Sequence, residues 1–180
     1  MTGFPLAVQN SIGAIHELFR EENGGTVADY IPELGMADPA DFGICITTRE
    51  GFSYEVGDTR VEFTIQSISK ALVYGLVLEL KGAQGLSGKV NVEPSGEAFN
   101  AISLDPVTGT PKNPMINAGA IATTGQLREF VGEESEARLL RFLSGLAGRE
   151  LTIDPAVYES ERDTGHRNRA ISHLLRYFDI

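Results

Sequence analysis

The chain has 180 residues, and its 25 acidic and 15 basic residues give a formal net charge of −10. Proteins that bind DNA or RNA carry a basic surface, and the absence of any basic stripe here argues against nucleic acid as a partner. With 42% hydrophobic and 22% charged residues, the composition is typical of a globular protein, and one cysteine excludes an internal disulfide framework.

The start of the chain and its apolar runs give no sign of export or membrane insertion. The first fifteen residues lack the basic start and apolar block of a signal peptide. The longest nearly uncharged apolar run, Ala71–Leu80, is too short for a membrane span, which needs about 20 residues. We therefore expect a cytoplasmic location and no membrane partner.

The first third of the chain predicts a helix followed by a β-hairpin. One side of segment 6–21 carries a stripe of apolar residues, Ile12, Ile15, Leu18 and Phe19. This spacing is typical of an amphipathic helix, and we expect Gly24-Gly25 to end it. Residues 42–48 and 52–56 are strand-like and lie on either side of a short turn, which predicts a hairpin. Cys45 lies on the first strand and is expected to be a small buried residue.

The rest of the chain predicts helices separated by ordered loops. Residues 66–81 are almost wholly apolar after Lys70, so we expect a helix buried on all sides and ended by Gly82 and Gly85. Segment 86–113 is rich in Gly, Pro, Asn and Asp and predicts a loop. Further helices are predicted over 114–123 with Pro114 at its first position, over 133–147 before Gly148, from Asp154-Pro155, and over 168–178.

One hairpin makes only a two-stranded sheet, which is marginally stable alone. The chain also stops at Ile180, directly after its last predicted helix. We therefore expect an α+β protein, with helices beside an antiparallel sheet, in which residues 1–180 are the N-terminal part of one domain that is incomplete at its C-terminal end.

Ser67 and Lys70 form an S-x-x-K motif. Residues i and i+3 share a helix face, so the serine hydroxyl can meet the lysine amine. Desolvation beside the apolar run would lower the lysine pKa, and a neutral amine could then activate the serine. The simpler alternative is a helix-capping serine and a lysine that reaches solvent. Ser69 is a second hydroxyl, but it does not share the face of Lys70.

Two further segments carry polar residues of interest. Asn117 lies in the small and apolar run 113–120, where a buried amide needs hydrogen-bond partners. It either ties the loop backbone or grips a polar substrate. Segment 161–168 is highly charged and by itself predicts a solvated loop. Alternatively, Glu161 pairs with a substrate ammonium and Asn168 binds a carboxylate or amide.

Metal-binding patterns are absent from the sequence, which contains no H-E-x-x-H, no C-x-x-C and no acidic calcium loop. The histidines lack ligand spacing, and we expect His166 and His173 to lie on the surface. No metal and no cofactor is expected.

Four blocks resemble, in order and spacing, the serine-dependent glutaminase family: Tyr30–Leu34, Thr64–Lys70, Asn113–Ile121 and Ser160–Asn168. That family shares its core fold with serine β-lactamases and penicillin-binding proteins. The resemblance implies a β-lactamase-like α+β fold, with a helical cluster beside an antiparallel sheet. It also implies a C-terminal part, outside these residues, that supplies further strands and an oxyanion-hole N–H.

The resemblance implies a role for each matching residue. Ser67 would attack the side-chain amide of L-glutamine, Lys70 would be its general base, and Tyr30 would belong to the catalytic group near the substrate. The residues implied to surround the substrate are Gln66, Ser67, Asn117, Glu161 and Asn168. The reaction would pass through an acyl-serine and yield L-glutamate and ammonia.

Two alternatives stay open at this point. The S-x-x-K motif also serves β-lactamases and peptidoglycan peptidases, although the lack of a signal peptide argues against these. A truncated, inactive chain that acts by association is the other alternative. The resemblance further implies a homo-oligomer, a dimer or tetramer, in the full-length form.

Overall fold

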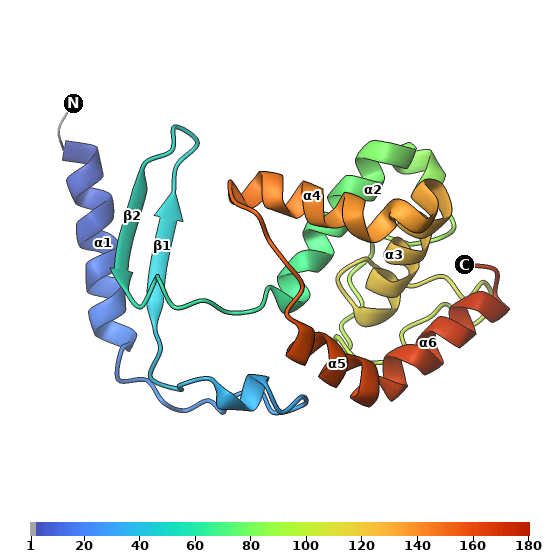
Figure 1. Ribbon diagram of the computed structural model, residues 1–180, viewed down its shortest axis with the longest axis horizontal. Helices are drawn as coiled ribbons and strands as arrows, with labels where there is room; N and C mark the ends of the chain where they lie inside the picture. The colour runs from blue at the N-terminus through green and yellow to red at the C-terminus, as the bar shows by residue number, and fades with distance from the viewer. Residues whose placement is uncertain (1–2) are drawn as a thin grey trace. The chain divides into compact units, whose positions relative to one another are not determined.

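The computed structural model describes residues 3–180, which form two compact units. Unit 1 holds the chain up to Thr64 together with Glu159–Glu161. Unit 2 holds Ile65–Tyr158 and Arg162–Ile180. The helices and strands are coloured in chain order in Figure 1.

Unit 1 consists of a helix packed on a hairpin. Helix α1 (Gly3–Phe19) contacts the antiparallel strands β1 (Gly43–Thr47) and β2 (Ser53–Gly57). A short 3-10 helix, Leu34–Met36, lies between α1 and β1 in the chain. The Gln9 amide also donates a hydrogen bond of 3.0 Å to the main-chain oxygen of Glu55 in β2. The helix and the hairpin predicted from the residue pattern are therefore confirmed.

Two predictions for unit 1 are wrong in detail. Helix α1 ends at Phe19, before Gly24-Gly25. Glu21 and Glu22 follow it, and acidic residues at a helix C-terminus oppose the helix dipole. Cys45 is exposed, not buried. It pairs with Glu55 in the register and so lies on the polar face of the hairpin.

Unit 2 is helical. Its elements are the 3-10 helices Gln66–Ile68 and Gly132–Glu134 and the helices α2 (Ser69–Leu86), α3 (Asn117–Val131), α4 (Ser135–Ala147), α5 (Pro155–Thr164) and α6 (His166–Tyr177). Residues 159–161 of α5 belong to unit 1. A small antiparallel sheet and a set of helices together give the predicted α+β class.

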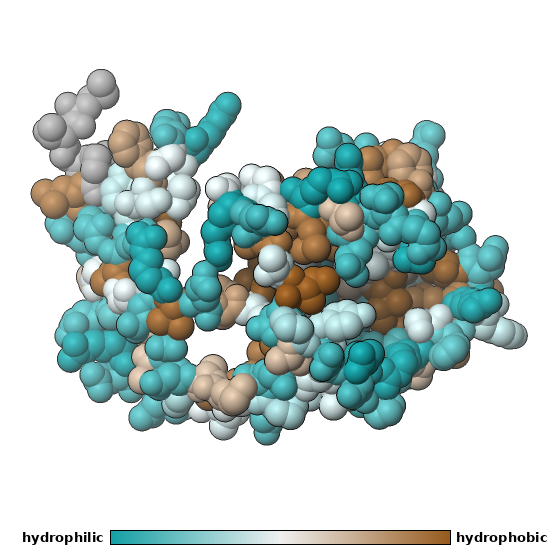
Figure 2. Space-filling model, in the orientation of Figure 1, coloured by the Kyte–Doolittle hydropathy of each residue, from teal (hydrophilic) through white to brown (hydrophobic). Residues whose placement is uncertain are grey.

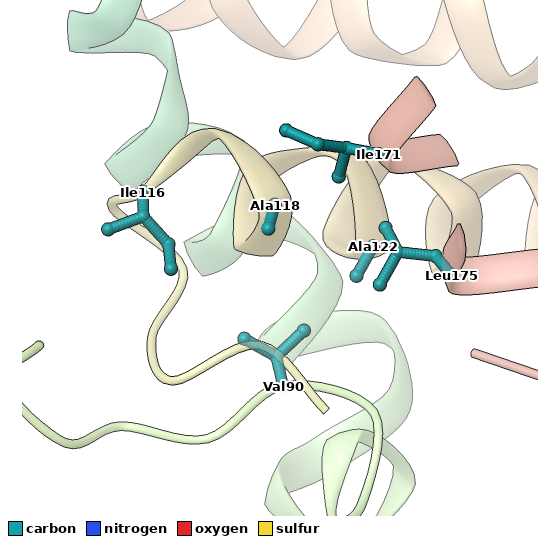
Figure 3. Packing of buried hydrophobic residues seen from close by; sticks show 6 residues of the cluster. All are labelled: Val90, Ile116, Ala118, Ala122, Ile171 and Leu175. Carbon is teal, nitrogen blue, oxygen red and sulfur yellow. The ribbon is translucent and has the colours of Figure 1, made fainter. Parts of the chain in front are cut away.

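Helix α3 joins two apolar clusters of unit 2. One cluster packs α3 against α6 and consists of Val90, Ile116, Ala118, Ala122, Ile171 and Leu175 (Figure 3). The other packs α2 against α3 and consists of Val73, Leu76, Val77, Leu86 and Leu127. Gly119 allows the first turn of α3 to approach the preceding loop, because a Cβ atom there would come within 1.8 Å of the Asn113 oxygen.

The boundaries of α2 and α3 differ from those predicted. Helix α2 continues to Leu86 across a kink at Gly82, where φ is 69°. It is not buried on all sides, since Leu76 is 2% exposed whereas Leu78 is 37% exposed. Helix α3 begins at Asn117 rather than at Pro114, because the Asn113 side chain accepts hydrogen bonds from the next amides and holds the turn before the helix.

Segment 161–168 is helical and not a loop. Helix α5 runs to Thr164 and α6 starts at His166, so Gly165 alone separates them. The Asp154 carboxylate accepts hydrogen bonds from the amides of the first turn of α5, which caps the predicted start at Asp154-Pro155. Charged side chains can remain solvated on the outer face of a helix, so their abundance does not predict a loop.

Helix α4 and the two histidines agree with prediction. Helix α4 ends at Ala147 and Gly148 follows in the left-handed conformation, with φ of 64°. His166 and His173 are exposed.

Apolar residues also reach the surface in many places, as Figure 2 shows in brown. Among residues 3–180, no helix is both long and apolar enough to cross a bilayer.

Candidate functional site

The S-x-x-K motif spans a 3-10 turn and the start of an α-helix. Ser67 is exposed in the turn Gln66–Ile68, and the half-buried Lys70 is the second residue of α2. Residues i and i+3 are eclipsed in a 3-10 turn, so the two side chains leave the same side of the chain. The motif thus spans two consecutive elements, whereas the sequence predicts one regular helix.

The backbone immediately before Ser67 is strained. Gln66 has φ of 42°, which is uncommon for a residue with a side chain. The Ser69 hydroxyl donates a hydrogen bond of 2.6 Å to the main-chain oxygen of Gln66 and thereby holds this turn. Strain of this kind is frequent at functional sites, where the surrounding structure imposes it.

A chain of hydrogen bonds connects three predicted site residues from three helices. The Lys70 Nζ donates to the Asn117 Oδ1 over 2.8 Å, and the Asn117 Nδ2 donates to the Asn168 Oδ1 over 3.1 Å. With Lys70 as the donor, the Asn117 oxygen faces Lys70 and its nitrogen faces Asn168. These contacts join α2, α3 and α6 at one place in unit 2.

The surroundings of Lys70 favour its neutral form. Burial lowers the pKa of its ammonium below the ordinary value, in the direction that the sequence predicts. The first turn of α3, which supplies Asn117, contains no acidic residue that would oppose this effect. A lysine of this kind can take a proton near neutral pH more readily than an exposed one.

Two other predicted residues meet in unit 1. Tyr30 is 58% exposed, and its pKa is raised, first by burial of part of the ring and second by the negative charge of Glu161. The phenol therefore stays protonated and can donate a hydrogen bond. Tyr30 and Glu161 belong to unit 1, whereas Gln66, Ser67, Lys70, Asn117 and Asn168 belong to unit 2.

Phe99 is a neighbour of the site that the sequence does not reveal. Its ring centroid lies 5.5 Å from the Lys70 Nζ, and its main-chain oxygen accepts a hydrogen bond of 2.9 Å from the Asn117 amide. It lies in the loop 86–113, where neither periodicity nor a motif marks one residue over another.

One hollow of unit 2 lies away from these residues. It has a volume of about 780 Å³ and lies between α4 and segment 148–153. None of the predicted site residues lines it, so its size does not make it the functional site. Among residues 3–180, no group of three or more metal-ligating side chains is close enough to hold an ion.

Comparison with known proteins identifies relatives over most of the chain. The model of the Glutaminase family matches residues 25–180. The chain is 54% identical over 158 residues to Glutaminase 1 of Bradyrhizobium diazoefficiens, which covers 88% of this chain and 26% of that protein. It is 46% identical over 172 residues to a glutaminase of Microcystis aeruginosa, which covers 96% of this chain and 51% of that protein.

Solved structures give the same result. The native form of Mglu superposes with a TM-score of 0.85 at 38% identity, over 96% of this chain and 42% of that one. A probable glutaminase, ybaS, superposes with a TM-score of 0.87 at 34% identity, over 95% of this chain and 56% of that one. The predicted β-lactamase-like α+β fold is thereby confirmed. The chain spans between a quarter and about half of the length of these relatives.

Proposed function

Since this chain belongs to the glutaminase family, whose model matches residues 25–180, we propose that the protein containing it hydrolyses L-glutamine to L-glutamate and ammonia. The family match over most of the chain is the observation that carries this proposal. The hydrogen-bonded group around Lys70 supports it with chemistry that such a reaction needs.

The first half of the proposed reaction forms an acyl-serine. Ser67 Oγ attacks the side-chain carbonyl carbon of glutamine while its proton passes to the neutral Lys70 amine. The amine keeps its lone pair for this proton because it only donates to Asn117. When the tetrahedral intermediate collapses, its C–N bond breaks, and the proton from Lys70 joins the leaving nitrogen as ammonia departs.

The second half of the reaction regenerates the enzyme. Lys70 takes a proton from water, and the resulting hydroxide attacks the ester carbon of the acyl-serine. The ester C–O bond breaks, L-glutamate leaves, and Lys70 returns its proton to Ser67. The lowered pKa of Lys70 keeps more of the amine neutral before each transfer and makes the ammonium a better proton donor afterwards.

The remaining predicted residues suit the two polar ends of the substrate. The Glu161 carboxylate would pair with the α-ammonium of L-glutamine. The amides of Asn117 and Asn168 would bind the oxygen atoms of the substrate. Tyr30, whose phenol stays protonated beside Glu161, and Gln66 complete the proposed set. We also propose that the enzyme is cytoplasmic. We further propose that it forms a dimer or tetramer, and sedimentation can test this oligomeric state.

Glutamate release from L-glutamine tests the proposed function. We expect the protein that contains this chain to release glutamate, and Ser67→Ala to lower the rate by at least about 10³-fold, because it removes the nucleophile. Ser87→Ala, at an exposed serine after α2, is the matched control and should retain the activity. Release that persists in Ser67→Ala would overturn the assignment of the nucleophile, and no release by the parent protein would overturn the function.

A further inference from the structure

Phe99 contacts the Lys70–Asn117 pair in two independent ways. Its ring faces the Lys70 Nζ at 5.5 Å from the ring centroid, and its main-chain oxygen accepts a hydrogen bond from the Asn117 amide at 2.9 Å. The second contact fixes the first residue of α3, because Asn117 is where that helix begins. One loop residue thus touches both partners of the hydrogen bond that holds the lysine.

The ring and the burial of Lys70 act on its charge in opposite directions. A cation above an aromatic face is attracted by the negative centre of the ring, so the ring favours the ammonium. Burial lowers the pKa of the same ammonium and is the single cause of that lowering. Lys70 donates a hydrogen bond to Asn117 of α3, which in turn donates to Asn168 of α6, and both of these amides are uncharged.

We propose that Phe99 is a positioning residue for the general base: its ring holds the Lys70 ammonium in place, and its carbonyl anchors Asn117 opposite it. Lys70 must be neutral to accept the serine proton and charged to give it to the leaving nitrogen. A weak attraction to the ring keeps the charged form available without making it permanent, as a carboxylate partner would. This inference rests on the proposed glutaminase reaction.

The pH dependence of kcat/KM for glutamate release distinguishes this role from simple packing. Phe99→Leu removes the aromatic face but keeps an apolar side chain and the main-chain carbonyl that binds Asn117. Without the ring the ammonium is less stable, so the pKa of Lys70 falls and the amine is neutral at lower pH. We expect the acidic limb of the profile to move down by about half a pH unit and Phe99→Tyr to restore it.

Phe130→Leu provides the matched control. Phe130 lies on α3 and is 55% exposed, close to the 59% exposure of Phe99, so the same substitution removes a similar ring from outside the site. Its profile should superimpose on that of the parent protein. A Phe99→Leu profile that also superimposes on the parent profile would overturn the inference.

A direct titration covers the case in which Phe99→Leu is inactive. Proteins labelled with ¹³C-lysine are titrated by NMR, and Lys70→Arg assigns the Lys70 signal. A lower midpoint in Phe99→Leu supports the inference, and an unchanged midpoint overturns it. The proposed function fails separately, through a parent protein without glutamate release or a Ser67→Ala variant that retains it.

Discussion

The two units of the chain differ in charge and in burial. Unit 1 contains thirteen acidic and three basic residues, so its net charge is −10, which equals that of the whole chain. Unit 2 contains twelve of each and is neutral. Of the fourteen buried hydrophobic residues in the described part of the chain, Ile12 and Ile31 belong to unit 1 and the other twelve to unit 2.

This difference between the two units explains why the Lys70 hydrogen-bond group lies in the packed unit. The Lys70–Asn117–Asn168 contacts come from three helices that share the buried clusters of unit 2, and a catalytic group needs such support to keep its geometry. Burial within this packed unit lowers the pKa of Lys70. Glu161, which we propose as the partner of the substrate ammonium, belongs to the acidic unit.

The largest expected effect is the loss of packing in unit 2 after Leu76→Ala. Leu76 is 2% exposed in the cluster between α2 and α3, so its removal leaves a cavity and should lower the free energy of unfolding by about 2–5 kcal/mol. Leu78→Ala, at a neighbour that is 37% exposed, should cost less than half as much. Denaturant unfolding followed by circular dichroism measures both.

Hydrogen exchange then shows whether the comparison between the units holds. We expect the amides of α2 and α3 to lose protection in Leu76→Ala, while those of β1 and β2 change less. Equal losses in both units would mean that the two units unfold as one, and the distinction between a packed unit and a loosely packed one would fail.

A smaller effect is expected from Glu161→Gln on Tyr30 in unit 1. The charge of Glu161 is the second cause, after burial, of the raised pKa of Tyr30. Removing this charge should lower that pKa while burial keeps it above the ordinary value. The ultraviolet absorbance of tyrosinate during a pH titration, with Tyr30→Phe to assign the signal, measures the change. Glu159→Gln on the same helix should leave it unaltered, and an equal shift in both variants would contradict the assignment.

The sequence predicts those features that depend on local pattern. The apolar stripe through Ile12 identifies α1, the alternation around the short turn identifies the hairpin, and Gly148 marks the end of α4. The start of α3 was misplaced because the Asn113 side chain holds a turn that competes with the helix-starting preference of Pro114. Cys45 is exposed because it lies on the polar face of the hairpin opposite Glu55, in a strand where four of the five residues are exposed.

The sequence does not predict which residues of the site contact one another. Lys70 and Asn117 are 47 residues apart and Asn117 and Asn168 are 51 apart, so no local pattern shows that they meet. The residue pattern marked each of the three separately, and the resemblance to a family grouped them around one substrate. Phe99 has no motif of its own, and its contact with Lys70 depends on how the loop 86–113 packs at the start of α3.

The smallest expected effect concerns the charge of unit 1 itself. Because thirteen acidic residues repel one another there, low salt should destabilise unit 1 while neutral unit 2 is unaffected. The screening length falls from about 30 Å at 0.01 M salt to about 3 Å at 1 M, so raising the salt concentration from 0.01 to 0.5 M removes most of this repulsion. We expect slower hydrogen exchange in α1 and the hairpin at high salt and no change in α2 and α3.

Reversing three exposed charges, with Glu21→Lys, Glu50→Lys and Glu62→Lys, should weaken the salt response of unit 1. An equal response of the two units, before and after these changes, would show that the uneven charge has no influence on stability.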